Sequence, residues 1–196
     1  MSEAVERLRE DLVVMEAMAA EMDEYLRSRS LFYPLGRADL PRLTLGGYLM
    51  RQHRLVALRD LLSEAEQQRL DDAMAVYRQA LVEKVVSFEQ RAHEELHARA
   101  RQWSEYLKEL RRPGFSAGDY YPSAVEPRLM IAVLLEKLSM PPYELDERVV
   151  EEIRVYDNVL RNHWQPGEFI WFEAWQPAYP PDQFWWLYGR PRSASK

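Results

Sequence analysis

Cysteine is missing from this chain, and its absence excludes several classes of protein. Without it, the 196 residues can form neither a disulfide framework nor a thiolate metal site. A chain without cysteine also suits a reducing compartment. The first ten residues, MSEAVERLRE, lack the apolar run of a signal peptide, and no segment reaches the roughly 18 consecutive apolar residues of a membrane span. We therefore expect a soluble cytoplasmic protein with no membrane contact.

Glycine is also scarce, with 7 residues in the whole chain. The abundant residues are Leu, Ala, Glu and Arg, which are among the best helix formers. Hydrophobic residues make up 47% of the sequence, which is enough for an ordinary globular core. The composition predicts an all-α fold.

The first predicted helix carries a regular apolar seam. Its apolar residues recur at alternating steps of three and four: Val5, Leu8, Leu12, Met15, Ala19, Met22 and Leu26. This spacing is typical of a coiled-coil seam, and it extends over about three heptads. Such a seam can pair with another helix of the same chain or with a second copy.

The longest predicted helix spans residues 63–112. Ser63 and Glu66 form an S-x-x-E capping box, and no glycine or proline follows until Pro113. The apolar stripe of this segment has a mean period of about 3.6 residues, which is typical of a straight helix. Its members are Leu70, Met74, Tyr77, Leu81, Val85, Phe88, Ala92, Leu96, Arg99, Trp103, Leu107 and Leu110. We predict an elongated helical bundle or hairpin built on this helix.

The remainder of the chain is divided by turn residues. A second S-x-x-E pattern, Ser123 to Glu126, precedes two further helical patterns at 127–140 and 143–164. We predict a long-helix bundle over 1–112, a smaller helical lobe over 113–168 and an extended tail over 169–196, with one domain overall as the alternative.

The predicted tail is rich in aromatic residues and prolines. The prolines prevent a continuous helix, so we expect an extended or short-stranded segment. The rings either close the core or form a docking surface, because Trp and Tyr dominate the energetics of interfaces. The candidate interaction residues are Trp171, Trp175, Tyr179, Trp185, Trp186 and Tyr188.

Charge is segregated near the amino terminus. Residues 1–26 carry eight acids and two arginines, whereas residues 27–59 carry seven arginines and one aspartate. The two segments either neutralise each other or leave the arginines free for an anion or a nucleic acid. The candidates for that second role are Arg27, Arg29, Arg51 and Arg54, and the pair Gly46-Gly47 at a helix start could add backbone donors.

The segment HEELH at residues 93–97 matches the H-E-x-x-H pattern of zinc peptidases. On a helix, His93 and His97 share a face, and Glu94 could activate a metal-bound water. No third ligand is marked by a motif, and Glu94 with His97 lacks the second E-x-x-H unit of a di-iron bundle. The alternative interpretation is an ordinary polar helix face.

No other catalytic pattern occurs: the sequence has no P-loop, no G-x-G-x-x-G and no G-x-S-x-G. We therefore expect a non-enzymatic scaffold, adaptor or assembly protein without a cofactor, which acts through helix packing and an aromatic C-terminal docking segment. It would bind a protein partner or form a homo-oligomer. The first alternative is a nucleic-acid-associated protein that uses residues 27–59. The second is a metal-dependent enzyme at His93 and His97.

Overall fold

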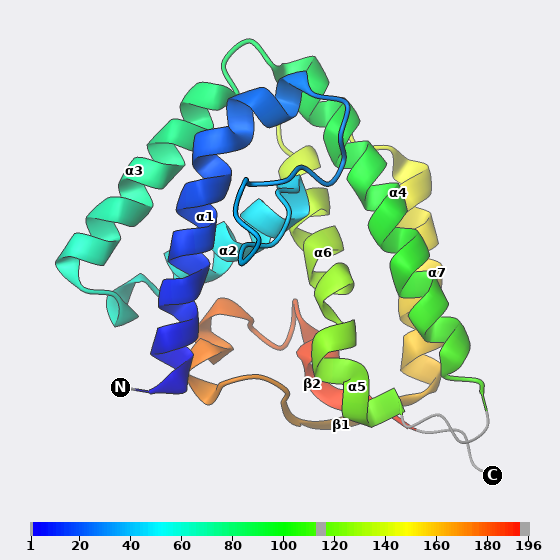
Figure 1. Cartoon of the computed structure of the whole chain (residues 1–196). Coiled ribbons are helices and arrows are strands. Elements are labelled where there is room, and N and C mark those ends of the chain that lie inside the picture. Colours follow the sequence, from blue (N-terminus) through cyan, green and yellow to red (C-terminus); the bar gives the residue numbers. More distant parts are fainter. Residues whose placement is uncertain (1, 113–116, 193–196) are drawn as a thin grey trace.

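The computed structural model describes residues 2–112 and 117–192 (Figure 1). Within these ranges, seven α-helices and one small two-stranded sheet confirm the all-α prediction. The α-helices are α1 (Glu3–Arg27), α2 (Leu45–Ala57), α3 (Glu64–Ala80), α4 (Val85–Glu109), α5 (Ala117–Ala124), α6 (Glu126–Leu138) and α7 (Glu147–Asn162). The strands are β1 (Trp164–Phe169) and β2 (Tyr188–Pro191), and short 3-10 helices lie at Arg59–Leu61, Glu173–Ala178 and Trp185–Leu187. None of the described helices is long and apolar enough to cross a membrane.

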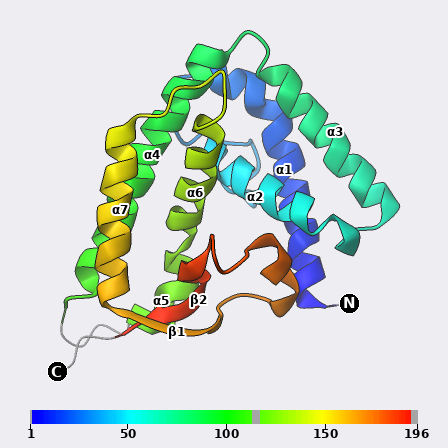
Figure 2. The same cartoon turned by 180° about the vertical axis from the view of Figure 1, so that it is seen from behind.

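The helices form two sides that meet near the turn between α3 and α4 (Figure 1). Helices α1 and α3 make one side, and α4 and α7 make the other, with α2 and α6 between them. The view from behind shows β1, β2 and the neighbouring 3-10 segments crossing the open end opposite that turn (Figure 2). Buried residues from Ala4 to Leu187 belong to one continuous core, so the two ends of the chain help to enclose the same interior.

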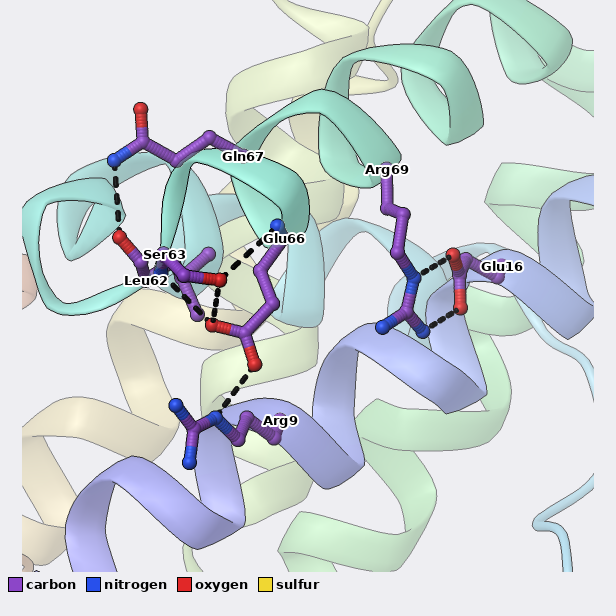
Figure 3. A network of polar contacts seen from close by, with 7 residues as sticks. All are labelled: Arg9, Glu16, Leu62, Ser63, Glu66, Gln67 and Arg69. Carbon is purple, nitrogen blue, oxygen red and sulfur yellow. Dashed lines mark hydrogen bonds and ion pairs between the residues drawn. The ribbon is translucent and has the colours of Figure 1, made fainter. Parts of the chain in front are cut away.

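The seam of α1 is buried inside the chain itself. Leu8, Leu12, Met15 and Met22 are fully buried, and the helix packs against α2, α3 and α4. Ion pairs join Arg9 to Glu66 and Glu16 to Arg69 along the contact with α3 (Figure 3). Of the two partners that the sequence left open, a helix of the same chain occupies this seam.

The single helix predicted over 63–112 is wrong in its continuity, because residues 81–84 separate α3 from α4. Glu83 adopts a positive φ of 61°, which a helix does not allow. The adjacent Lys84 pairs with Asp23 of α1, which fixes the turn against the first helix. Tertiary packing overrides local helix propensity here, because the break lets α3 follow α1 while α4 turns to pack on α6. Most of the predicted stripe is still buried, although Val85 is exposed.

The predicted capping box at the start of α3 is confirmed (Figure 3). The Glu66 backbone N–H donates to Ser63 Oγ, and the Ser63 backbone N–H donates to Glu66 Oε2 at 2.8 Å. Arg9 Nε donates to the other oxygen of Glu66 at 2.6 Å. The cap therefore serves both the helix start and the contact between α1 and α3.

Replacing Ser63 by Ala is expected to lower the free energy of unfolding by about 1 kcal/mol, the usual effect of losing a side-chain cap. Thermal or urea unfolding measures the change, with Ser139→Ala as the control at an exposed serine. The hydrogen bond from the Ser63 backbone N–H holds the pKa of Glu66 below its ordinary value. The ionised Glu66 carboxylate therefore stabilises the fold fully at a pH above the ordinary pKa of glutamate. This stabilisation is lost as the pH falls through the lowered pKa of Glu66 in the folded protein. Equal stability of Ser63→Ala and the parent protein would contradict a stabilising cap.

The second predicted capping box is wrong. Ser123 lies inside α5, where its Oγ donates to the Tyr120 carbonyl, and Val125 is the residue that precedes α6. Pro127 lies in the first turn of α6, where its missing N–H costs nothing. The helix predicted over 143–164 is shorter in the structure, where α7 spans Glu147–Asn162.

Candidate functional site

A buried group of charges joins α1 to α2. Asp11 lies on the inner face of α1, and its carboxylate contacts Arg51 Nε at 3.1 Å and Arg54 Nη1 at 2.5 Å. Arg51 also donates to the Gly47 carbonyl at 2.8 Å. Burial lowers the pKa of the Arg51 guanidinium, and the negative charge of Asp11 opposes this effect. No sequence motif marks Asp11, although its position three residues after Leu8 places it on the apolar face of the helix.

The guanidinium of Arg54 extends this group to the C-terminal tail. Its Nε donates to the Tyr179 hydroxyl at 2.8 Å, and its Cζ lies 4.0 Å from the centroid of the Trp175 ring. Trp171 lies farther away, at 5.5 Å. Two sets of predicted site residues, the arginines and the tail aromatics, therefore meet at one place. The contacts satisfy the buried charge and stack its planar group on a ring.

The six candidate aromatics of the tail lie partly inside the core. Trp175, Tyr179 and Trp186 are buried. The other three, Trp171, Trp185 and Tyr188, are half-buried and pack against the core.

Hydrogen bonds and a cation–π contact attach the tail to the rest of the chain. Trp175 Nε1 donates to the Ala4 carbonyl at 3.2 Å, and Trp171 Nε1 donates to the Pro122 carbonyl at 2.9 Å. Arg128 pairs with Asp157 through two 2.8 Å hydrogen bonds, and its Cζ lies 3.8 Å from the ring centroid of Trp186. In this structure the tail closes the core.

The arginines of residues 27–59 are mostly paired with acids. Arg27 pairs with Asp23 on the surface of α1, and Arg37 pairs with Asp39. Arg59 pairs with Asp71 of α3, and not with the first helix, through two hydrogen bonds of 2.6 Å. Exposed Arg29 makes no ion pair within the part of the chain that the structure describes. The positive charge of this segment is therefore largely neutralised within the fold.

The histidines of HEELH lie in different surroundings. His93 Nδ1 is 2.9 Å from the Glu89 carbonyl, and its Nε2 accepts from the Asp146 backbone N–H at 3.3 Å. Nδ1 therefore contacts the backbone of α4 itself, and Nε2 joins α4 to Asp146, the residue that precedes α7. His97 and Glu94 are exposed, and Glu94 pairs with Arg91 at 3.3 Å. Among the described residues, no three His, Asp or Glu side chains gather as a metal site.

The buried residue of the motif is Glu95, which the zinc pattern leaves unspecified. Its side chain is fully buried, and Oε2 accepts from the Gly46 backbone N–H at 2.8 Å. Arg99 Nε donates to the other oxygen at 3.1 Å. A carboxylate is well placed at a helix N-terminus, where free N–H groups and the helix dipole favour negative charge. The anion at the glycine pair is thus a side chain of the protein itself.

The glycine at position 46 is required by this contact. A Cβ at Gly46 would lie 2.7 Å from Glu95 Oε1 and 3.0 Å from the Met130 Cβ. Neither distance is compatible with normal packing, so only glycine lets the start of α2 approach α4 and α6 this closely.

An exposed apolar region lies at the turn between α3 and α4. We name it the valine surface: it consists of the exposed Val76, Val82, Val85 and Val86 and of a groove lined by Ala19, Ala20, Ala75 and Ala80 together with Asp23, Gln79, Glu83 and Lys84. Val82 is 53% exposed and Val86 is 69% exposed. Beside them, the alanines of α1 and α3 line a groove of about 570 Å³. Clustered exposed apolar side chains of this kind mark interaction surfaces more often than single ones do.

No model of a known protein family matches the sequence, and comparisons with curated proteins and with solved structures gave no match. Function is therefore inferred from the residues and their geometry.

Proposed function

We propose that this protein is a non-enzymatic helical assembly protein that forms homo-oligomers through the valine surface. The observation that carries the proposal is the position of exposed valines beside an alanine-lined groove. Burying a fully exposed valine contributes roughly 1.5 kcal/mol, and each of these valines, which are 38–69% exposed, contributes a corresponding fraction to association. Small residues in the groove let a neighbouring chain approach the backbones of α1 and α3 closely.

A second copy of the chain is the occupant that this surface fits. The projecting part includes Val82, which lines the same groove as the recessed Ala20 and Ala75, and exposed Val86 follows four residues later in the first turn of α4. A surface that carries both a projection and a recess can be self-complementary about a two-fold axis, which is the usual symmetry of dimers. The seam of α1 and the buried tail aromatics have the role of stabilising each subunit in this proposal.

Replacing Val86 by Glu is expected to convert the oligomer to a monomer. A charge buried without a partner opposes association, and a weakening on the order of 100-fold corresponds to about 2.7 kcal/mol. The subunit itself should remain folded, because an acid in the first turn of α4 is favourable to the helix. Light scattering coupled to size-exclusion chromatography, over a range of protein concentrations, measures the mass.

Val155→Glu is the matched control, since Val155 is 52% exposed on α7 and lies outside the valine surface. Ala20→Arg tests the groove independently of the valines. A parent protein that remains monomeric at high concentration would contradict the proposal. Equal changes in the molecular mass in solution for Val86→Glu and Val155→Glu would also contradict it.

A further inference from the structure

A second recess lies between α2 and α6, away from the valine surface. One stripe of each helix faces it: Leu49, Gln52, His53 and Val56 from α2, and Val133, Glu136, Lys137 and Met140 from α6 and the residues that follow it. In each set the second, third and fourth of these residues lie three, four and seven positions after the first, so the residues within each helix lie on one face of that helix. The volume is about 310 Å³, which lies at the lower end of the range for small-molecule sites.

The wall of this cleft contains a hydrogen-bond acceptor without a partner. Gln52 Oε1 is buried, and no donor among the described residues reaches it. Buried polar atoms are almost always hydrogen-bonded, because an unpaired one loses its contact with water without a replacement. The half-buried Gln52 side chain lines the cleft, so a rotation of its amide would bring this atom to a hydrogen-bond donor on a bound molecule.

The cleft also holds a cation without a carboxylate partner. Lys137 is half-buried, forms no ion pair in the described part of the chain, and places its Nζ 5.6 Å from the ring centroid of Tyr143 and 6.0 Å from that of Phe88. Burial lowers the pKa of the Lys137 ammonium, since its charge is removed from water without a full replacement. An anionic group beside Nζ would stabilise the charged form.

One ring nitrogen of His53 already has a hydrogen-bond partner in the tail. Its Nε2 lies 2.7 Å from the Ala178 carbonyl, so this nitrogen carries the proton and the ring is fixed against the tail. Leu49, Val56, Val133 and Met140 supply an apolar surface between the polar groups. Val56 and Met140 are 47% and 46% exposed, which leaves the cleft open to a ligand from solvent.

We infer that the cleft between α2 and α6 binds a small amphipathic acid, with an apolar body, a hydrogen-bond donor for Gln52 and a carboxylate for Lys137. The apolar side chains take the body of the molecule, and the two polar groups set its orientation. This site is independent of the proposed assembly, because no residue of the valine surface lines it.

The test uses indole-3-acetate, which combines an aromatic body, a ring N–H and a carboxylate. Two analogues each lack one feature: indole-3-acetamide lacks the charge, and 1-naphthaleneacetate lacks the N–H. Two-dimensional NMR of the full chain follows the backbone signals of α2 and α6 during titration. The expected result is saturable shifts at the cleft, with indole-3-acetate binding more tightly than either analogue.

Replacing Lys137 by Met is expected to weaken indole-3-acetate about tenfold or more, the usual consequence of losing a charge-assisted contact. The same change should leave indole-3-acetamide unaffected, and Lys137→Arg should restore most of the affinity for the acid. Gln52→Leu is expected to weaken indole-3-acetate but not 1-naphthaleneacetate. An absence of shifts at millimolar probe, or equal binding of all three compounds, would overturn the inference. So would a Lys137→Met variant that folds normally and binds the acid as well as the parent does.

Discussion

Replacing Asp11 by Ala is expected to lower the free energy of unfolding by about 3–5 kcal/mol, the range for breaking a buried ion pair from one side. The change leaves the guanidinium groups of Arg51 and Arg54 close together without their shared carboxylate. Arg54 cannot turn outward to water, because its Nε donates to Tyr179 and its plane lies against Trp175. Urea unfolding followed by circular dichroism measures the loss.

The matched control for Asp11→Ala is Glu10→Ala, one position earlier on the same helix. Glu10 pairs with Arg7, and both side chains are more than half exposed, so its removal should cost less than about 1 kcal/mol. Arg54→Met in the Asp11→Ala background should recover part of the lost stability, since it removes one of the two unpaired charges. Similar stabilities for Asp11→Ala and Glu10→Ala would contradict a structural role for the buried group.

Replacing Glu95 by Ala is expected to cost about 3 kcal/mol, at the upper end for hydrogen bonds to a charged group. The Gly46 N–H would lose its acceptor inside the core, and Arg99 would lose its carboxylate partner. Urea unfolding gives the total effect. In the Glu95→Ala variant, the backbone amides in the first turn of α2 should exchange their hydrogens faster than the backbone amides of α4 do.

The comparison within HEELH separates a structural role from a metal site. His97 and Glu94 are exposed, so replacing either by Ala should change stability by less than about 0.5 kcal/mol. A zinc peptidase would show the reverse order of importance, because His97 and Glu94 would be the ligand and the base while Glu95 would be dispensable. A larger effect at His97 than at Glu95, with added zinc, would contradict the capping role.

Local patterns in the sequence predicted the helices well, because periodicity reports which face a helix buries. The seam of α1 and the capping box at Ser63 depend on residues within one or two turns, and both are found as predicted. The break after Leu81 depends on distant partners instead. No glycine or proline marks it, and Lys84 meets Asp23 only once α1 and α3 are packed.

The charged residues show the same division between local and distant information. The acidic first helix and the basic segment after it raised mutual neutralisation as one interpretation, and Asp11 indeed contacts Arg51 and Arg54. The sequence did not identify which acid is buried, nor that Tyr179 and Trp175 would complete its surroundings. Likewise, the H-E-x-x-H pattern draws attention to the two histidines, whereas only the packing of α2 on α4 shows that Glu95 is the buried acid.

The contact between Trp175 and Ala4 has a consequence for how the chain is made. These residues are 171 positions apart, so a ribosome that has finished α1 must add almost the whole of the described chain before the tail can reach it. Until then, the charges of Asp11 and Arg54 lack the rings of Trp175 and Tyr179 that cover them. Contacts between such distant residues form late and slow folding. Until residues 171–188 are made, the apolar surface that Trp175 and Tyr179 cover in the finished fold has no cover, and surface of this kind is prone to aggregation.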